Sequence, residues 1–444
     1  MPYRHRRRGR EAGRRTTVTV PVSRPGADLT WAGPPALRGA VRTGPDRRSS
    51  PAGFGVIWTT VAIDQIGFGM VLPILGIYAR RLGASAFEAI AIVAAYSLAA
   101  FLLSPVLGSL SDRVGRKPVL VVSLLGTAVG GLLSGLAGSL WVLYLGRVLD
   151  GLSGPSQLTA QAAVTDMTDG PERARLLGRL GSAFAFGIVV GPGLAALLAL
   201  VDPRFPFFIA AALAGGNALV ALWRLPETRW REEPRTTPVA GPAASARAAL
   251  NPLVARLLVV AAVAMLAFSG FEASFSVLGQ DQLGFDEATS AAVFMGVGLA
   301  LGFVQLTLVG AVTDRLGDQG GVRLGLISTG VGFCFIAAVG GWAPLVVGLG
   351  FLVAGQGLLR PSLTSAVSRV TDPRARGAAI GLQTSATGLA RILGPLLAAA
   401  LYRGVGIPAP YLVAAAVVLL ALLLVPGRVP LRDLAYPHDP VTLE

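Results

Sequence analysis

The chain has 444 residues, of which 53% are hydrophobic and only 14% are charged, and its formal net charge is +14. A soluble protein carries a charged fraction of about 25%, so this composition excludes an ordinary soluble domain and indicates an integral membrane protein. Cys334 is the only cysteine, which excludes a disulfide within one chain, and the two histidines, His5 and His438, stand near the two ends of the sequence. We therefore expect no metal site, no Ser-His-Asp triad and no enzyme activity, and the lack of a phosphate-binding loop argues against direct use of ATP.

Residues 1–52 form a segment rich in arginine, proline and glycine that has no apolar run. Such a segment cannot bury a core, so we expect a disordered cytoplasmic tail. It also lacks the apolar region of a signal peptide. We favour an inert extension, or one that arises from a start codon assigned too early. Contact with anionic lipid and a mitochondrial-type transit peptide are the alternatives.

Twelve apolar segments of about 20 residues, the length that crosses a bilayer, follow from residue 54 onward. They run over 54–79, 88–110, 118–138, 140–164, 174–200, 205–224, 253–279, 287–312, 322–341, 343–367, 376–401 and 408–426. A polar, proline-rich stretch divides the first six from the last six. We therefore expect an N-terminal six-helix bundle at 53–225, a cytoplasmic linker at 226–251, a C-terminal six-helix bundle at 252–427 and a cytoplasmic tail at 428–444.

The arginines lie mostly in the loops on one side of the predicted spans. The loops of the other side hold only Arg80, Arg81, Arg204 and Arg403 as basic residues. An excess of basic residues marks the cytoplasmic side of a membrane protein, so we expect both termini in the cytoplasm. The same placement argues against nucleic acid as a partner, because the orientation of the protein in the bilayer already explains why the arginines cluster on one side.

One loop sequence occurs twice. Residues 108–117 read Gly-Ser-Leu-Ser-Asp-Arg-Val-Gly-Arg-Lys and residues 310–317 read Gly-Ala-Val-Thr-Asp-Arg-Leu-Gly, an offset of 310 − 108 = 202. Each copy stands between two apolar spans. A repeat at this period in an apolar chain indicates a transporter built from two similar halves.

The first copy closely resembles the loop 2–3 signature of the major facilitator superfamily, Gly-x-Leu-Ala-Asp-Arg-x-Gly-Arg-Lys. The resemblance implies an all-α membrane fold, with twelve transmembrane helices in two pseudo-symmetric six-helix bundles, and a cytoplasmic gate at the repeated loops. Pseudo-symmetry then places Asp112 near Arg376, at the start of the eleventh span, and Asp314 near Arg175, at the start of the fifth. The predicted gate residues are Gly108, Asp112, Arg113, Gly115, Arg116, Lys117, Gly310, Asp314, Arg315, Arg175 and Arg376.

The fifth span carries a second motif, formed by Gly178, Gly187, Gly191 and Pro192. Its spacing matches the antiporter motif of drug/proton exchangers, although that motif continues with Gly-Gly where this chain has Ala-Ala. The resemblance implies a hinge between the halves that favours exchange and limits leak. The eleventh span repeats the theme with Gly394-Pro395. Generic helix packing between small residues is the alternative.

Ionisable residues inside the spans are the candidates for proton coupling and substrate contact, because a charge in the bilayer needs a partner or a wet cavity. Asp64 lies in a first-span sequence that resembles tetracycline-type and multidrug members of the drug/proton antiporter group; a structural hydrogen bond is the alternative. Arg147 lies in the fourth-span stretch Gly146-Arg147-Val-Leu-Asp150-Gly151, which resembles a superfamily motif whose arginine is implicated in proton coupling. Asp150, three residues later, can instead neutralise Arg147 on the same helix.

Glu272 in the seventh span and Arg391 in the eleventh complete the candidate set. Burial beside Phe271 and Phe275 suits Glu272 to carry a proton, whereas a position at the outer rim would leave it solvated. Arg391 either pairs with a carboxylate or binds an anionic substrate. Arg360, in the tenth span, is a further charge to which the sequence assigns no role.

The resemblance predicts a secondary active transporter that exports a small amphipathic organic compound or drug in exchange for protons, by alternating access. The proton gradient is expected to supply the energy without a cofactor. The expected partners are the substrate, protons and lipid, and the expected unit is a monomer in the plasma (inner) membrane. A proton symporter or uniporter for a sugar or other metabolite is the first alternative. A non-transporting sensor or assembly factor on the same fold is the second, and the carboxylates within the spans argue against it.

Overall fold

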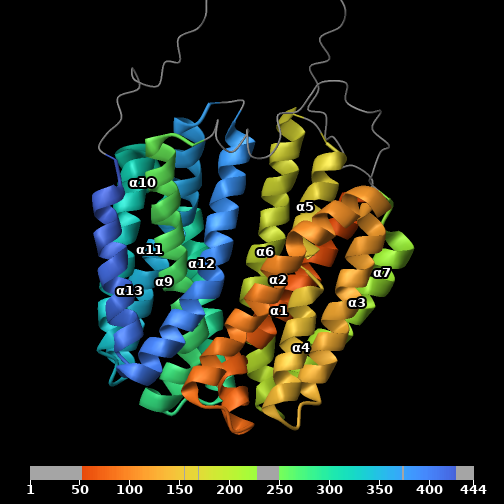
Figure 1. Cartoon of the computed structure of the whole chain (residues 1–444), viewed down its shortest axis with the longest axis horizontal. Helices are drawn as coiled ribbons and strands as arrows, with labels where there is room; N and C mark the ends of the chain where they lie inside the picture. The colour runs from red at the N-terminus through yellow and green to blue at the C-terminus, as the bar shows by residue number, and fades with distance from the viewer. Residues whose placement is uncertain (1–52, 155, 169, 228–249, 373–374, 427–444) are drawn as a thin grey trace, which may run out of the picture. The chain divides into compact units, whose positions relative to one another are not determined.

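A computed structural model describes residues 53–154, 156–168, 170–227, 250–372 and 375–426. The predicted tails and most of the predicted linker lie outside these residues. The described chain consists of helices and connecting turns and contains no strand (Figure 1). In chain order the helices are α1 (Phe54–Arg81), α2 (Ala86–Val114), α3 (Arg116–Gly135), α4 (Leu140–Leu152), α5 (Ser156–Asp166), α6 (Gly170–Ala199), α7 (Phe205–Arg224), α9 (Pro252–Leu283), α10 (Glu287–Ala337), α11 (Trp342–Val370), α12 (Arg376–Gly404), α13 (Ala409–Leu420) and the short 3-10 helix η1 (Ala421–Leu424).

These helices fit the twelve predicted passes. Nine of the described helices are long and apolar enough to cross a membrane. Of these, α10 supplies two passes, because Gly317 (φ 70°, ψ 175°) interrupts its 51 residues. Helices α4 and α5 together supply a further pass, and α13 with η1 supplies the last.

The repeated motif is more helical than the sequence predicts. The predicted loop at 111–117 is wrong, since α2 ends at Val114 and α3 begins at Arg116, which leaves Gly115 alone between them with φ 121°. Gly317, 202 positions later, is the matching break in the second half. A single residue suffices because glycine, which lacks a Cβ, readily adopts positive φ.

Two further boundaries differ from the prediction. The stretch between the predicted spans 287–312 and 322–341 is helical on both sides of Gly317. The unbroken span predicted at 140–164 is in fact two helices, because the chain leaves the helical conformation after Ser153 and turns at Gly154, with φ 76°. The hydrophobic pattern runs through this break, which is why it does not reveal the turn.

Apolar clusters show where the two halves of the chain meet. One cluster lies within α1–α7 and includes Ile57 and Leu180, and a second lies almost wholly within α9–η1. The third unites both halves, since it contains Tyr78 of α1 together with Val277 of α9 and Tyr402 of α12. These residues lie far along their helices from the turns at Gly115 and Gly317. We call the end with those two turns the basic end and the other the opposite end; the halves share a core at the opposite end.

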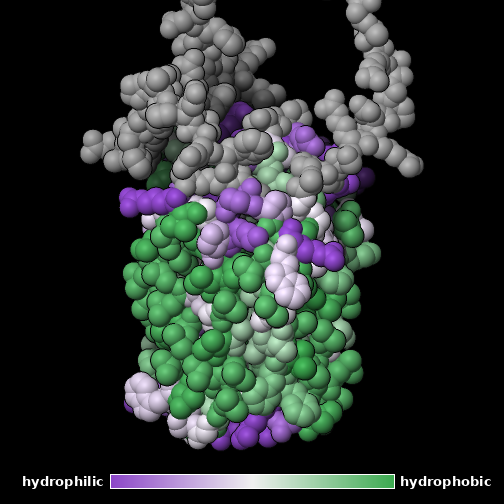
Figure 2. Space-filling model, turned by 90° about the vertical axis from the view of Figure 1, so that its right-hand side faces the viewer, coloured by the Kyte–Doolittle hydropathy of each residue, from purple (hydrophilic) through white to green (hydrophobic). Residues whose placement is uncertain are grey.

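The surface supports a membrane-embedded protein. Figure 2 shows a broad hydrophobic band between polar rims on the face it displays. Large apolar side chains are exposed on α3 and α7, including Val122, Leu132 and Leu222. Water would penalise so wide an apolar surface, whereas lipid would cover it. The protein is therefore a multi-pass membrane protein.

Candidate functional site

A cavity of about 730 Å³ lies between the two halves. Its volume falls in the range of sites that hold drug-sized ligands. Apolar and aromatic side chains alternate with charged ones along its walls. The lining includes Asp64, Phe68, Tyr96, Arg147, Asp150, Arg360 and Arg391.

On the wall built by α1–α7, Arg147 is held by two partners. Its side chain is buried, with 4% of the residue exposed. Nε and Nη2 donate to the hydroxyl of Ser134 at 3.2 and 3.1 Å, and Nη1 donates to Oδ2 of Asp150 at 3.2 Å. Arg147 and Asp150 thus form the ion pair that their spacing allows. Asp64 accepts a long hydrogen bond from Gln65, at 3.4 Å, and lies on the same wall.

On the wall built by the second half, Nη2 of Arg391 donates to Oε2 of Glu272 at 3.0 Å. The Glu272 side chain is 15% exposed and that of Arg391 is 37% exposed. The structure therefore describes a paired carboxylate rather than a solvated one at a rim. Arg391 therefore pairs with a carboxylate in this conformation, which is one of its two predicted roles.

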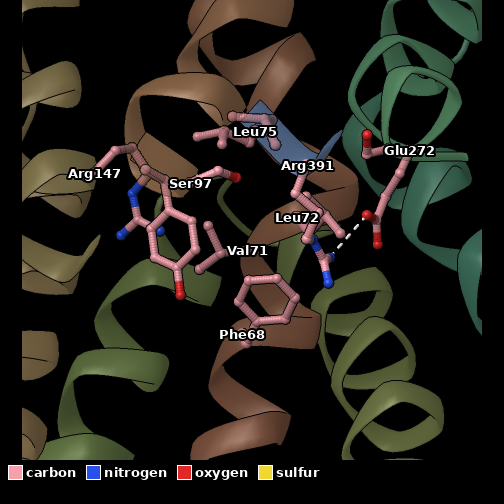
Figure 3. A pocket seen from close by; sticks show the side chains of 11 residues that line it. Phe68, Val71, Leu72, Leu75, Ser97, Arg147, Glu272 and Arg391 are labelled. Atoms are coloured by element: carbon pink, nitrogen blue, oxygen red, sulfur yellow. Dashed lines mark hydrogen bonds and ion pairs between the residues drawn. The ribbon is translucent and has the colours of Figure 1, made fainter. Parts of the chain in front are cut away.

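A narrow recess of about 30 Å³ continues from the cavity between these two ion pairs. Figure 3 shows Phe68 and Val71 between Arg147 on one side and Arg391 with Glu272 on the other. Leu72 adds to this apolar filling. The two ion pairs are therefore separated by hydrophobic side chains in this conformation.

A cluster of charged side chains surrounds Arg116 at the basic end. Its guanidinium contacts Asp112 at 2.5 Å, Asp166 at 2.8 Å and the hydroxyl of Ser111 at 2.9 Å. Glu227 accepts hydrogen bonds from the backbone N–H groups of Arg116 (2.9 Å) and of the next residue (3.2 Å). A carboxylate at this place stabilises the N-terminus of α3. Sequence reasoning missed Asp166 and Glu227, whose only signal is an acidic residue just after an apolar span.

The second half carries a related pair with reversed charge. Asp318 follows Gly317 as Arg116 follows Gly115, and it forms an ion pair with Arg369 at 2.8 Å. Arg369 ends α11 much as Asp166 ends α5. The pseudo-symmetry thus preserves an ion pair at this position while exchanging its acidic and basic members.

The two predicted gate contacts are not formed in the described part of this conformation. Asp112 pairs with Arg116, and Nε of Arg376 donates to the carbonyl oxygen of Ser368 at 3.0 Å. Asp314 and Arg175 are both exposed. The contacts remain predictions for another conformation of the protein.

Polar contacts join the halves at the opposite end. Arg81 of α1 binds Glu287 of α10 with two nitrogens, and the Nη2–Oε2 distance is 2.6 Å. Arg80 pairs with Asp281 of α9 at 3.3 Å. The hydroxyl of Ser290 donates to the carbonyl oxygen of Pro73 at 2.7 Å. Sequence analysis did not identify Glu287 or Asp281 as partners, because residues about 200 positions apart carry no local pairing signal.

The motif glycines permit close helix contact. A methyl group added at Gly191 would lie 2.6 Å from the carbonyl oxygen of Ile66, and one at Gly69 would lie 2.9 Å from that of Gly187. Helices α6 and α1 therefore approach backbone to backbone. Gly394 of α12 plays the same part against α9. Gly178, by contrast, faces open space.

A family model with the description Major Facilitator Superfamily matches residues 57–321 and 307–440. The chain belongs to this superfamily. The resemblance found in the sequence is thereby confirmed, and so is the prediction of a membrane transporter rather than an enzyme, because transport is what the superfamily does.

Named members of the superfamily are similar over most of their length. The tetracycline resistance protein of class C from Escherichia coli is 33% identical over 78% of this chain and 89% of its own length. Multidrug resistance protein 2 from Bacillus subtilis is 26% identical over 83% of this chain and 93% of its own. The fold is also that of a bacterial homologue of the human lysosomal transporter Spinster, solved in an inward-facing, unoccupied conformation. The two structures align with a TM-score of 0.67 and 15% sequence identity, over 88% of this chain and 100% of the homologue.

The site of this superfamily member contains side chains suited to binding and proton transfer. In the described part of the chain, no group of three or more His, Cys, Asp and Glu side chains could hold a metal ion. The cavity-lining groups that are charged at neutral pH are carboxylates and guanidinium groups. Of these, only carboxylates can take up and release protons near neutral pH, since arginine stays charged.

Proposed function

We propose that this protein exports a small amphipathic organic compound or drug in exchange for protons. Support comes from relatives named for tetracycline and multidrug resistance. The single observation that carries the proposal is the large cavity between the halves, in which carboxylates stand among apolar and aromatic side chains. Such a lining can hold an amphipathic molecule and a proton in one place.

The arrangement of contacts supports alternating access as the mechanism. A shared apolar core and three cross-half polar contacts close the opposite end. Substrate would enter from the basic end, which we assign to the cytoplasm. Breaking the contacts at the opposite end, while Asp112 and Asp314 close the basic end, would release substrate outside the cell. The protein would lie in the plasma (inner) membrane with both termini in the cytoplasm.

Proton coupling is assigned to the carboxylates of the cavity and its recess, Asp64, Asp150 and Glu272. Asp150 and Glu272 each pair with an arginine. Protonation of a paired carboxylate would release Arg147 or Arg391 and so couple the proton to a movement of the walls. The close α1–α6 contact at Gly187 and Gly191 supports exchange, because it leaves little space for leak. The proton gradient then supplies the energy, and a monomer contains the whole site.

The test is drug resistance in an Escherichia coli host that lacks its own efflux pumps. Cells that express the protein are challenged with a panel that includes tetracycline and ethidium. We expect raised resistance, lost with Asp64→Asn at normal protein level in the membrane. Asp202→Asn is the matched control, because Asp202 caps a turn at the opposite end and is outside the cavity. Resistance unchanged by Asp64→Asn contradicts the coupling role, and loss of the protein itself indicates a structural one.

A further inference from the structure

The charged side chains of the cavity and its recess are divided unevenly between two walls. When all are ionised, the wall built by α1–α7 has one arginine and two carboxylates, a net charge of −1. The wall built by α9, α11 and α12 has two arginines and one carboxylate, a net charge of +1. The members are Asp64, Arg147 and Asp150 on the first wall and Glu272, Arg360 and Arg391 on the second.

Arg360 is the charge that lacks compensation on the second wall. In the part of the chain that the structure describes, it forms no hydrogen bond and no ion pair, although it lines the cavity. The charged groups that act on it are Arg391, which repels it, and Glu272, which attracts it. Glu272 is already bound by Arg391 at 3.0 Å. The neighbourhood of Arg360 therefore keeps an excess of positive charge.

The depth of Arg360 within its helix argues against a purely structural role. It stands ten residues before Val370, where α11 ends, as Asp64 stands ten residues after Phe54, where α1 begins. At 1.5 Å per residue, both lie roughly 15 Å inside their helices from the basic end. Arg360 is exposed to the cavity, the setting in which a charge within a span is tolerated, so its guanidinium is open to water or to a ligand there. It also cannot lose its charge by deprotonation, so it is unsuited to carry the proton.

We propose that Arg360 binds an anionic group of the substrate, a carboxylate or another oxyanion, on the wall opposite Asp64. The planar guanidinium offers paired N–H donors that fit an oxyanion. The rest of the substrate would lie against Phe68, Tyr96 and the carboxylate wall, which favours a neutral or cationic remainder. This inference rests on the proposed function, because it takes the cavity as the substrate site.

Dye binding to the purified full-length protein tests this assignment. Rhodamine B, a zwitterion with a free carboxylate, is compared with its ethyl ester, a cation of nearly the same shape. Binding is followed by fluorescence anisotropy in phosphatidylcholine nanodiscs, which contain no anionic lipid that could compete for the arginine. The variants are Arg360→Gln, Arg360→Lys and Arg360→Glu. Arg256→Gln is the control, since Arg256 is exposed on α9 and is outside the cavity lining.

We expect the wild type to prefer the free carboxylate. Arg360→Gln should weaken rhodamine B binding roughly 10- to 100-fold, the effect of losing a charge-assisted hydrogen bond, and leave the ester nearly unchanged. Arg360→Lys should restore part of the affinity, and Arg360→Glu should favour the ester. Arg256→Gln should change neither dye.

Three results overturn the assignment: equal affinity of the wild type for both dyes, failure to bind rhodamine B, or an equal loss of both dyes in Arg360→Gln. Because the measurement is binding without a gradient, it separates this assignment from the proposed exchange. If Asp64→Asn abolishes drug resistance while Arg360 shows no charge preference, the transport proposal stands and the anion site falls. If binding is charge-selective but the protein confers no resistance, the anion-site assignment stands and the proposed export function is contradicted.

Discussion

Glu287→Gln should loosen the closure of the opposite end. The Glu287 side chain is 2% exposed and receives two nitrogens of Arg81, whereas the Arg81 side chain is 54% exposed. Removing one partner of a buried, hydrogen-bonded charge pair costs about 2–5 kcal/mol. Water recovers part of this loss at the half-exposed Arg81, so the lower end, about 2 kcal/mol, applies here. Since 1.4 kcal/mol is a factor of ten, the ratio of open to closed conformations should rise roughly 30-fold.

Distances between spin labels report this equilibrium. Cys334→Ser removes the one native cysteine, and cysteines introduced at Ser139 and Gly340 place labels on exposed turns of the two halves at the opposite end. Pulsed electron–electron double resonance then gives the populations of short and long distances between the labels. Glu88→Gln is the matched control, because Glu88 lies at the same end but accepts hydrogen bonds from Ser85 within its own half. A distance distribution in Glu287→Gln equal to that of the control refutes the assigned closure.

Two pairs of substitutions test the packing and the ion pair of the second wall. Gly191→Val should abolish resistance and reduce the amount of folded protein, because the added Cβ meets the Ile66 carbonyl at 2.6 Å, whereas Gly178→Val, in open space, should be tolerated. Size-exclusion profiles and resistance assays compare the two variants. Equal behaviour would show that the motif glycines do not serve close helix packing. Arg391→Met should destabilise the protein by up to about 3 kcal/mol, the lower end for a buried pair, because it leaves Glu272 without its partner while the side chains are 37% and 15% exposed; adding Glu272→Met should restore much of the loss. Thermal unfolding in nanodiscs measures this recovery, and a double variant no more stable than Arg391→Met contradicts the pairing.

The sequence predicts the apolar passes and the two-half architecture well, because both depend on local composition and on a repeated motif. The pair Arg147–Asp150 was also predictable, since three residues on one helix bring side chains together. The partners of Arg116 and Arg81 were not predictable. Asp166, Glu227 and Glu287 reach these arginines only after distant helices have packed, and tertiary contacts of this kind leave no periodic signal.

The turns between the helices are a second feature that the sequence predicts only in part. Hydrophobic periodicity places α10 correctly as two passes, yet it suggests a polar loop where the structure needs only Gly317. It also conceals the break at Gly154, since apolar residues lie on both sides. Arg360 was visible in the sequence as a charge within a span. Its lack of a partner depends on the tertiary structure, in which Glu272 is bound to Arg391.

The central claim is exchange of an organic compound for protons, and proteoliposomes test it most directly. Purified protein is reconstituted with an acidic lumen and a pH-sensitive dye inside, and ethidium or tetracycline is added outside. We predict drug accumulation together with luminal alkalinisation, both absent in Asp64→Asn and in protein-free liposomes. Drug flux that is indifferent to the pH gradient, or no gradient-driven flux of any tested drug, sugar or amino acid, would contradict the account.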